Sequence, residues 1–156
     1  MAELKDRLRA DLSTAIKSRS DITVATLRMA LTAITTEEVA GAEARELSDD
    51  EVLAVLAREA KKRREAAEMF AAAGRAELAT RERAEGDVLA HYLPTQLTDD
   101  ELAALIAEAL DDVAGQLGKP PGLGQLGLVM KAAKAQAAGR VEGKRLAAAV
   151  MATLKP

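Results

Sequence analysis

The 156-residue sequence contains no cysteine and almost no aromatic side chains. Without cysteine, disulfide bonds, thiolate metal ligands and cysteine nucleophiles are excluded. Phe70 and Tyr92 are the only aromatic residues, although 49% of the residues are hydrophobic. A core of alanine, leucine and other aliphatic side chains is typical of closely packed helices. The composition therefore favours a helical protein.

The sequence also lacks any apolar run of the roughly 18 residues that a membrane-spanning helix requires. Its first residues, MAELKDRLRADL, alternate charges with leucine and contain no apolar core of a secretory signal peptide. We therefore expect a cytoplasmic protein that does not associate with a membrane.

No segment alternates apolar and polar residues as a half-buried strand would, whereas helical spacing of apolar residues runs along most of the chain. We expect an all-α fold with seven helices. The expected helices cover about 3–18, 21–41, 49–73, 75–92, 99–114, 124–137 and 141–154. Ser20 is the expected N-cap of the second helix, and Gly41 its expected end.

The stretch LPTQLT interrupts the helical pattern after Tyr92. Pro94 cannot continue a helix, because proline lacks a backbone N–H and clashes with the preceding turn. We expect a domain boundary there. The prediction is a four-helix, bundle-like domain over residues 1–93 and a small three-helix domain over residues 94–156.

Two similar acidic strings, LSDDEV at 47–52 and LTDDEL at 97–102, raise the possibility of a carboxylate metal site. Each string also contains a serine or threonine followed three residues later by glutamate, which is the capping box. Leucine before the cap and an apolar residue four positions after it form the hydrophobic staple. We therefore interpret both strings as helix starts, and we expect no metal site.

Two further motifs are weak indications of catalysis or cofactor binding. GLGQLG at 122–127 matches the dinucleotide-binding glycine pattern, but GKPP precedes it where that pattern requires a strand. His91 is the only histidine, and no neighbouring nucleophile or metal ligand accompanies it. We expect a turn at GLGQLG, a helix cap or interface role for His91, no catalytic residues and no cofactor.

Positive charge is concentrated at the C-terminal end. Residues 113–156 carry seven lysines and arginines against one glutamate, a net of +6, so the rest of the −3 chain carries −9. Such a cluster is typical of contact with a polyanion. Arg140, Lys144 and Arg145 are expected to open the seventh helix, where the helix dipole disfavours cations. The cations of REAKKRRE at 58–65 are instead expected on a solvated helix face with internal ion pairs, among them Glu59 with Arg63.

The chain resembles the YqeY family, also called the GatB/YqeY family. The resemblance rests on HYLPTQLTDDELAALIAEAL, on LGLVMKAAKAQAAGRVEGKRLAAAVMATL, and on the upstream TLRMALTAI and EVLAVLAREAKKRREAAEMFAAAGRAEL. It covers essentially the whole chain. The family usually carries a lysine where this chain has Leu128, so one positive charge is missing there.

The resemblance implies a helical N-terminal domain followed by a smaller three-helix domain. It also implies a link to the C-terminal tail of the GatB subunit of the glutamine-dependent tRNA amidotransferase, which helps to hold tRNA. Any carbon–nitrogen ligase activity is implied by this resemblance alone. The candidate RNA-binding residues are Lys131, Lys134, Arg140, Lys144 and Arg145.

Three functions therefore remain open. The first is a tRNA-binding module linked to amidation of mischarged tRNA, without an active site of its own. The second is a protein–protein interaction module with no role in RNA binding. A small enzyme is the third, and it has the least support, because no nucleophile–base pair or metal-ligand spacing is present.

Overall fold

The computed structural model describes residues 2–155 and contains, within them, seven α-helices and no strand. The predicted all-α fold is therefore confirmed. The chain divides into two compact units, residues 1–93 and residues 94–156. None of the helices in the described part of the chain is both long enough and apolar enough to cross a bilayer.

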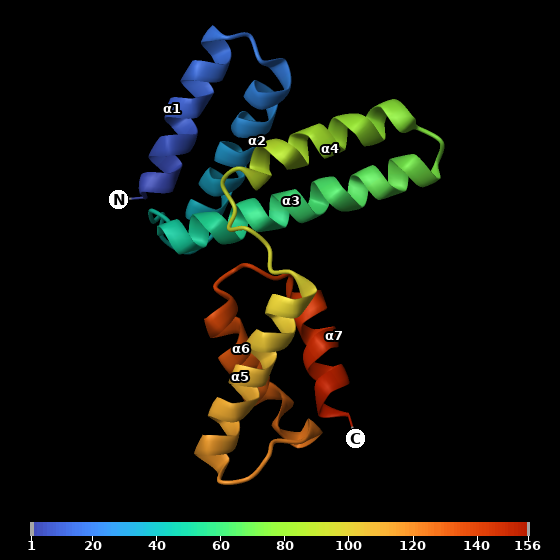
Figure 1. Cartoon of the computed structure of the whole chain (residues 1–156). Coiled ribbons are helices and arrows are strands. Elements are labelled where there is room, and N and C mark those ends of the chain that lie inside the picture. Colours follow the sequence, from blue (N-terminus) through green and yellow to red (C-terminus); the bar gives the residue numbers. More distant parts are fainter. Residues whose placement is uncertain (1, 156) are drawn as a thin grey trace. The chain divides into compact units, whose positions relative to one another are not determined.

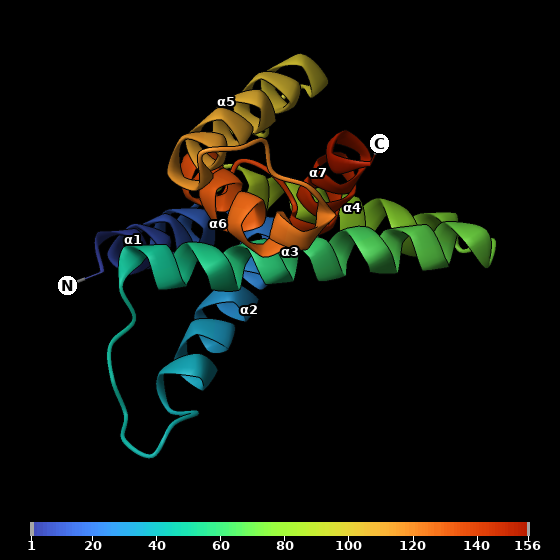
Figure 2. The ribbon, with the colours of Figure 1, turned by 90° about the horizontal axis from the view of Figure 1, so that it is seen from below.

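The first unit consists of two helical hairpins. They are formed by α1 (Glu3–Lys17) with α2 (Asp21–Glu38), and by α3 (Asp49–Ala72) with α4 (Ala76–Ala90). Figures 1 and 2 show that α2 crosses the long helix α3, so the two hairpins meet at an angle. Their buried apolar side chains include Leu8, Leu27, Ile34, Leu56 and Leu89.

Helix α2 differs most from its prediction within this unit. It ends at Glu38 instead of Gly41, and residues 39–48 form a loop that projects from the hairpin in Figure 2. Ser20 occupies the N-cap position, but its side chain makes no capping bond and lies 3.3 Å from the hydroxyl of Ser18. Ser20 is therefore the N-cap residue, as predicted, although it caps the helix without a side-chain hydrogen bond.

Glu38 explains where α2 ends. Its carboxylate accepts a hydrogen bond from Lys5 Nζ at 2.5 Å and another from the backbone N–H of Leu47 at 3.1 Å. The Glu38 side chain is 12% exposed and that of Lys5 is 10% exposed. The Lys5 hydrogen bond, followed by that of Leu47, holds the pKa of Glu38 below its usual value. One carboxylate thus joins α1, the end of α2 and the start of α3.

The capping box at Ser48 is confirmed. The Ser48 hydroxyl accepts from the backbone N–H of Glu51, and the Glu51 carboxylate accepts from the backbone N–H of Ser48. Leu47 and Val52, the two staple residues, are buried. Arg45 contacts both oxygens of Glu51, and this pairing, with the Ser48 hydrogen bond, lowers the pKa of Glu51 to about 2. Glu51 and Asp49, which accepts from the backbone N–H of Leu4 at 3.1 Å, therefore have structural partners.

Tyr92 is tied into the first unit just before that unit ends. Its hydroxyl donates to Asp11 at 2.6 Å, and the guanidinium of Arg7 lies 4.9 Å from the centre of its ring. Burial, together with the hydrogen bond to Asp11, raises the pKa of the Tyr92 hydroxyl. These contacts attach the last residues of the unit to α1.

One predicted ion pair of α3 is replaced in the structure, whereas Lys61 does lie 4.0 Å from Glu65. Arg63 reaches α4, where its Nη1 lies 3.4 Å from Glu82 and 3.6 Å from Glu85. Glu59 pairs with Lys62 at 3.2 Å. The predicted pairing of Glu59 with Arg63 is replaced because α4 packs along α3 and places two carboxylates beside the arginine.

The second unit contains α5 (Asp99–Leu117), the short 3-10 turn η1 (Leu123–Gln125), α6 (Leu126–Ala137) and α7 (Gly143–Leu154). Helix α5 is three residues longer than predicted and ends where Gly118 adopts a left-handed conformation, with φ 71°. The most buried core side chains are small or medium in size, namely Ala109, Val129, Ala133, Leu146 and Val150. Small side chains allow helices to approach closely, in agreement with the lack of aromatic residues.

The contacts of Glu38 predict a pH-dependent contribution to stability. Since the folded-state pKa is lowered, this contribution is present above the unfolded value of 4.5 and is lost as pH falls through the folded value. Glu38→Gln leaves the nearly buried Lys5 unpaired, so we expect a loss of about 1–3 kcal/mol in the free energy of unfolding at pH 7. Urea denaturation of both proteins at pH 7 and at about pH 3 measures this difference in the free energy of unfolding.

The difference between Glu38→Gln and the unchanged protein should shrink at the lower pH. Glu46→Gln, an exposed change in the same loop, is the matched control and should alter stability by less than about 0.5 kcal/mol. A loss for Glu38→Gln that is equal at both pH values would contradict the assignment.

Candidate nucleic-acid interface

The five candidate RNA-binding residues lie on α6, in the turn that follows it, and in the first turn of α7. On α6, Val129, Ala133 and Ala137 are buried, as predicted. Lys131 and Lys134 lie off this buried stripe and are exposed. The spacing of apolar residues was therefore enough to place these two lysines at the surface.

Arg140 does not open α7, contrary to the prediction. Ala138 and Gly139 adopt consecutive left-handed conformations, with φ 49° and 80°, and the chain turns through Glu142 before α7 begins at Gly143. The Arg140 guanidinium donates through Nε to the carbonyl of Ala137 at 3.0 Å and through Nη2 to that of Gln136 at 3.2 Å. Arg140 therefore satisfies carbonyl groups at the C-terminal end of α6, where a cation is favoured by the helix dipole.

Arg145 lies in the first turn of α7, as predicted, but its guanidinium is held within the second unit. Nη1 donates to the backbone carbonyl of Leu97 at 2.8 Å, and Nη2 contacts the carboxylate of Asp99 at 2.6 Å. The Arg145 side chain is 35% exposed. It joins α7 to the residues that begin α5.

Those residues also form the second capping box, which is confirmed. The Thr98 hydroxyl accepts from the backbone N–H of Glu101 at 3.2 Å, and the Glu101 carboxylate accepts from the backbone N–H of Thr98 at 3.2 Å. Hydrogen bonds from the side chain and backbone of Thr98 lower the pKa of Glu101. The start of α5 is thus fixed by its own cap and by Arg145.

Lys144, next to Arg145, is exposed. With Lys131 and Lys134 it forms a set of three exposed lysines, which we call the lysine surface. Within residues 2–155, none of the three forms an ion pair with a carboxylate. Leu128, at the position where a lysine is missing, is 46% exposed on the same helix as Lys131 and Lys134. The three ammonium groups of the lysine surface are therefore exposed to solvent.

The remaining candidate motifs, GLGQLG and His91, lie at a helix start and a helix end. GLGQLG forms η1 and the start of α6, where the backbone N–H of Gly122 donates to the side chain of Gln125 at 2.7 Å. His91 is the C-cap residue of α4 and is exposed. Across residues 2–155, no group of three or more histidine, aspartate or glutamate residues is arranged to hold a metal ion.

The family model of Yqey-like proteins matches residues 5–154. The chain belongs to the YqeY family. The match includes both units and all three residues of the lysine surface, which confirms the resemblance noted from the sequence. No curated protein matches the chain.

One feature of this surface could not be found by sequence reasoning. Arg140 and Arg145 belong to the same positively charged C-terminal segment as the three lysines. Arg145, however, donates to a backbone carbonyl 48 residues earlier in the chain. No local pattern indicates such a partner. Arginine's planar group of five donors suits it to carbonyl and carboxylate partners, which offers a weak reason to separate the arginines from the lysines.

The contacts of Arg145 predict that two adjacent cations differ in their effect on stability. Arg145→Ala should lower the free energy of unfolding of the second unit by about 1–2 kcal/mol, because it removes a charge-assisted hydrogen bond to the Leu97 carbonyl. Lys144→Ala, the matched control, should change it by less than about 0.5 kcal/mol. Hydrogen exchange measured by mass spectrometry reports both variants segment by segment.

We propose that the two units are independent domains with a boundary between Leu93 and Pro94. Faster exchange in Arg145→Ala should then be confined to residues 94–156. Equal acceleration in residues 1–93 would contradict this division, and equal effects of Arg145→Ala and Lys144→Ala would contradict the structural role of Arg145.

Proposed function

We propose that this protein binds tRNA through the lysine surface of its second unit. The observation that carries this proposal is the set of three exposed lysines, which form no ion pair with any carboxylate within residues 2–155. A lysine ammonium that is exposed and unpaired can neutralise a phosphate and release its counterions. Membership of the YqeY family supports tRNA as the particular polyanion, through the resemblance to the GatB tail.

The charge distribution supports this choice of surface. Residues 113–156 carry a net charge of +6, whereas the rest of the chain carries −9. A polyanion is therefore attracted to the C-terminal segment and repelled by most of the remaining surface. Arg140 and Arg145, which hold α6 and the start of α5, contribute positive potential there, while the lysines are the residues proposed to contact phosphate.

The composition of the second unit indicates how RNA would be read. Residues 94–156 contain no aromatic side chain, so bases cannot stack on this unit as they do on aromatic single-strand binding proteins. Contacts from lysines to phosphates follow the shape of the backbone and carry little sequence information. We therefore propose recognition of folded tRNA by its backbone.

We propose that the protein acts as an accessory to tRNA-dependent amidotransfer and contributes no catalytic residue. The link to amidotransfer rests on the family resemblance. Under this proposal the protein holds or presents tRNA, and a separate glutamine-dependent carbon–nitrogen ligase performs the reaction.

Fluorescence anisotropy of labelled total tRNA tests the binding proposal. Three phosphate contacts correspond to a slope of about −2.1 to −2.7 in log K against log salt, so affinity should fall about 20- to 40-fold between about 50 and 200 mM salt. The triple variant Lys131→Glu, Lys134→Glu and Lys144→Glu should lose binding at about 50 mM salt, because three attractive contacts become repulsive.

A control variant distinguishes a loss of binding caused by the lysine surface from one caused by the change in net charge. Lys17→Glu, Arg28→Glu and Arg83→Glu make the same change in charge at exposed positions of the first unit and should retain most of the affinity. Equal loss in both variants would contradict the site assignment. No binding by the unchanged protein at about 50 mM salt would overturn the RNA proposal itself, since electrostatic contact is strongest there.

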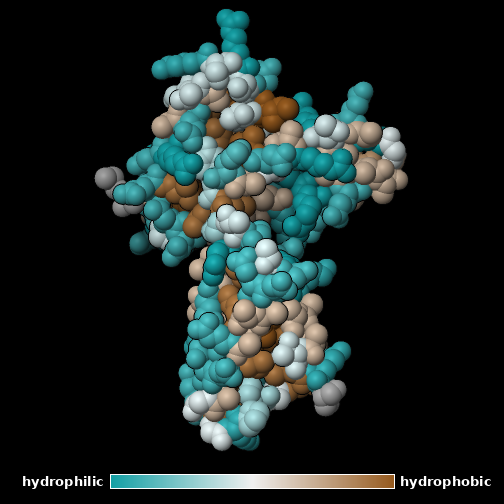
Figure 3. Space-filling view, viewed as in Figure 1, coloured by the Kyte–Doolittle hydropathy of each residue, from teal (hydrophilic) through white to brown (hydrophobic). Residues whose placement is uncertain are grey.

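Exposed apolar side chains favour a second candidate, a protein–protein interaction module. Met69 is 73% exposed and Leu78 is 40% exposed near the end of the α3–α4 hairpin. On the face shown in Figure 3, apolar side chains in brown are interspersed among hydrophilic ones in teal. Exposed apolar patches mark interaction sites when they are contiguous. Cross-linked capture that recovers a protein partner but no RNA, and that is lost in Met69→Ser with Leu78→Ser, would support this candidate.

A further inference from the structure

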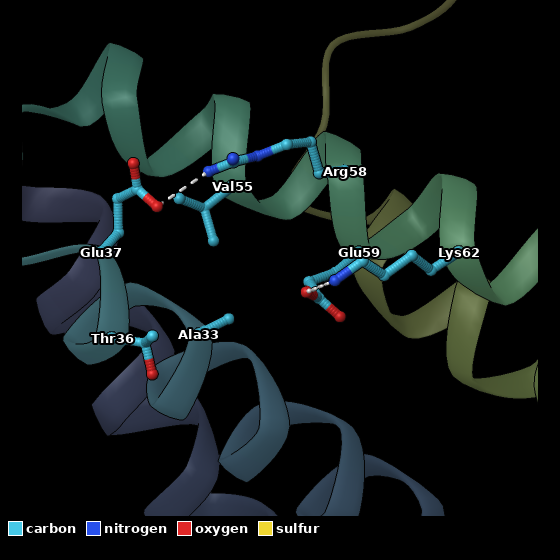
Figure 4. Close-up of a pocket in the computed structure, with 7 residues that line it drawn as sticks. All are labelled: Ala33, Thr36, Glu37, Val55, Arg58, Glu59 and Lys62. Carbon is cyan, nitrogen blue, oxygen red and sulfur yellow. Dashed lines mark hydrogen bonds and ion pairs between the residues drawn. The ribbon is translucent and has the colours of Figure 1, made fainter. Parts of the chain in front are cut away.

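A groove lies between α2 and α3 in the first unit. It has a volume of about 390 Å³. Figure 4 shows that its walls come from one face of each helix. Ala33, Thr36 and Glu37 line it from α2, and Val55, Arg58, Glu59 and Lys62 line it from α3. It belongs to a different unit from the lysine surface and is independent of the tRNA proposal.

The groove combines both signs of charge with a small apolar wall. Glu37 Oε2 lies 3.4 Å from Arg58 Nη2, and Glu59 Oε1 lies 3.2 Å from Lys62 Nζ. Ala33 and Val55 supply the apolar surface, and Val55 is buried. The four charged groups cancel, so the groove is neutral as a whole but strongly polar along its rim.

Glu59 is the unusual residue of the groove. It is only 8% exposed, although carboxylates are rarely buried unless they are well paired. Its partner Lys62 has a side chain that is 64% exposed and lies on the same helix, three residues away. Lys62 contacts this carboxylate through Oε1. A ligand with a positive group would give this carboxylate a second partner.

These charges limit the class of ligand. A polyphosphate or other strong anion would meet Glu37 and Glu59, and a polycation would meet Arg58 and Lys62. A small molecule with one positive and one negative group satisfies both signs at once. The volume lies near the lower end of the range for ligand pockets, which favours a molecule with few atoms.

We propose that this groove binds a free α-amino acid with a small uncharged side chain. The ammonium group contacts Glu59, and the carboxylate contacts Arg58, whose planar donors match a carboxylate. The amino-acid side chain lies against Ala33 and Val55. The side chains of Glu37 and Arg58 are 46% and 60% exposed. Because exposed ion pairs contribute little free energy, breaking this pair to admit a ligand costs little free energy.

The proposal is tested by following backbone amide signals of the ¹⁵N-labelled full-length protein by NMR. L-Alanine, L-valine and L-threonine are titrated separately, and saturable shifts are expected at Ala33, Val55, Arg58 and Glu59. Arg58→Gln should weaken the apparent affinity about tenfold or more, because one charge-assisted contact is lost. Arg58 is exposed, so this variant should remain folded. Arg28→Gln, an exposed change on α2 outside the groove, should leave the affinity unchanged.

Truncated ligands provide the second control. L-Valinamide keeps the ammonium without the carboxylate, and 3-methylbutanoate keeps the carboxylate without the ammonium. Each should bind at least about tenfold more weakly than L-valine. The proposal is overturned if none of the three amino acids gives saturable shifts up to about 20 mM, or if L-valine and both truncated ligands bind equally.

Discussion

The backbone of Leu97 connects the parts of the small helical unit, and the organisation of that unit depends on it. Its N–H donates to the carbonyl of Arg140 at 2.8 Å, and its carbonyl accepts from Arg145 at 2.8 Å. The Leu97 side chain is buried in the core that α5, α6 and α7 share. One residue therefore joins the start of α5, the turn after α6 and the first turn of α7. In a core of small aliphatic side chains, such polar ties specify which helix ends meet.

This connection also divides the five candidate RNA-binding cations of the unit into two groups. Arg140 and Arg145 direct their guanidinium groups to carbonyl and carboxylate partners inside the unit. Lys131, Lys134 and Lys144 remain exposed on α6 and α7. The division follows the chemistry of the side chains, because a planar guanidinium suits fixed partners and a flexible ammonium suits mobile phosphates. The same framework thus positions the helices and leaves positive charge at the surface.

Features encoded by neighbouring residues were predictable, whereas contacts between distant residues were not. The helix starts at Ser48 and Thr98 followed from capping boxes of four residues, and the exposure of Lys131 followed from the spacing of apolar residues on α6. Glu38 ends α2 through Lys5 and Leu47, and Arg145 reaches Leu97 across 48 positions. No local pattern indicates such pairs, because they form only when separate helices pack together.

The central claim is that the three exposed lysines, and not the arginines or other lysines, contact tRNA. Acetylation of lysines measured by mass spectrometry, with and without tRNA, tests it directly for each residue. Under conditions that favour binding, we expect Lys131, Lys134 and Lys144 to be protected, while Lys17 and Lys62 react equally in both samples. Unchanged reactivity of the three lysines, with tRNA shown to be bound in the same sample, would contradict the claim.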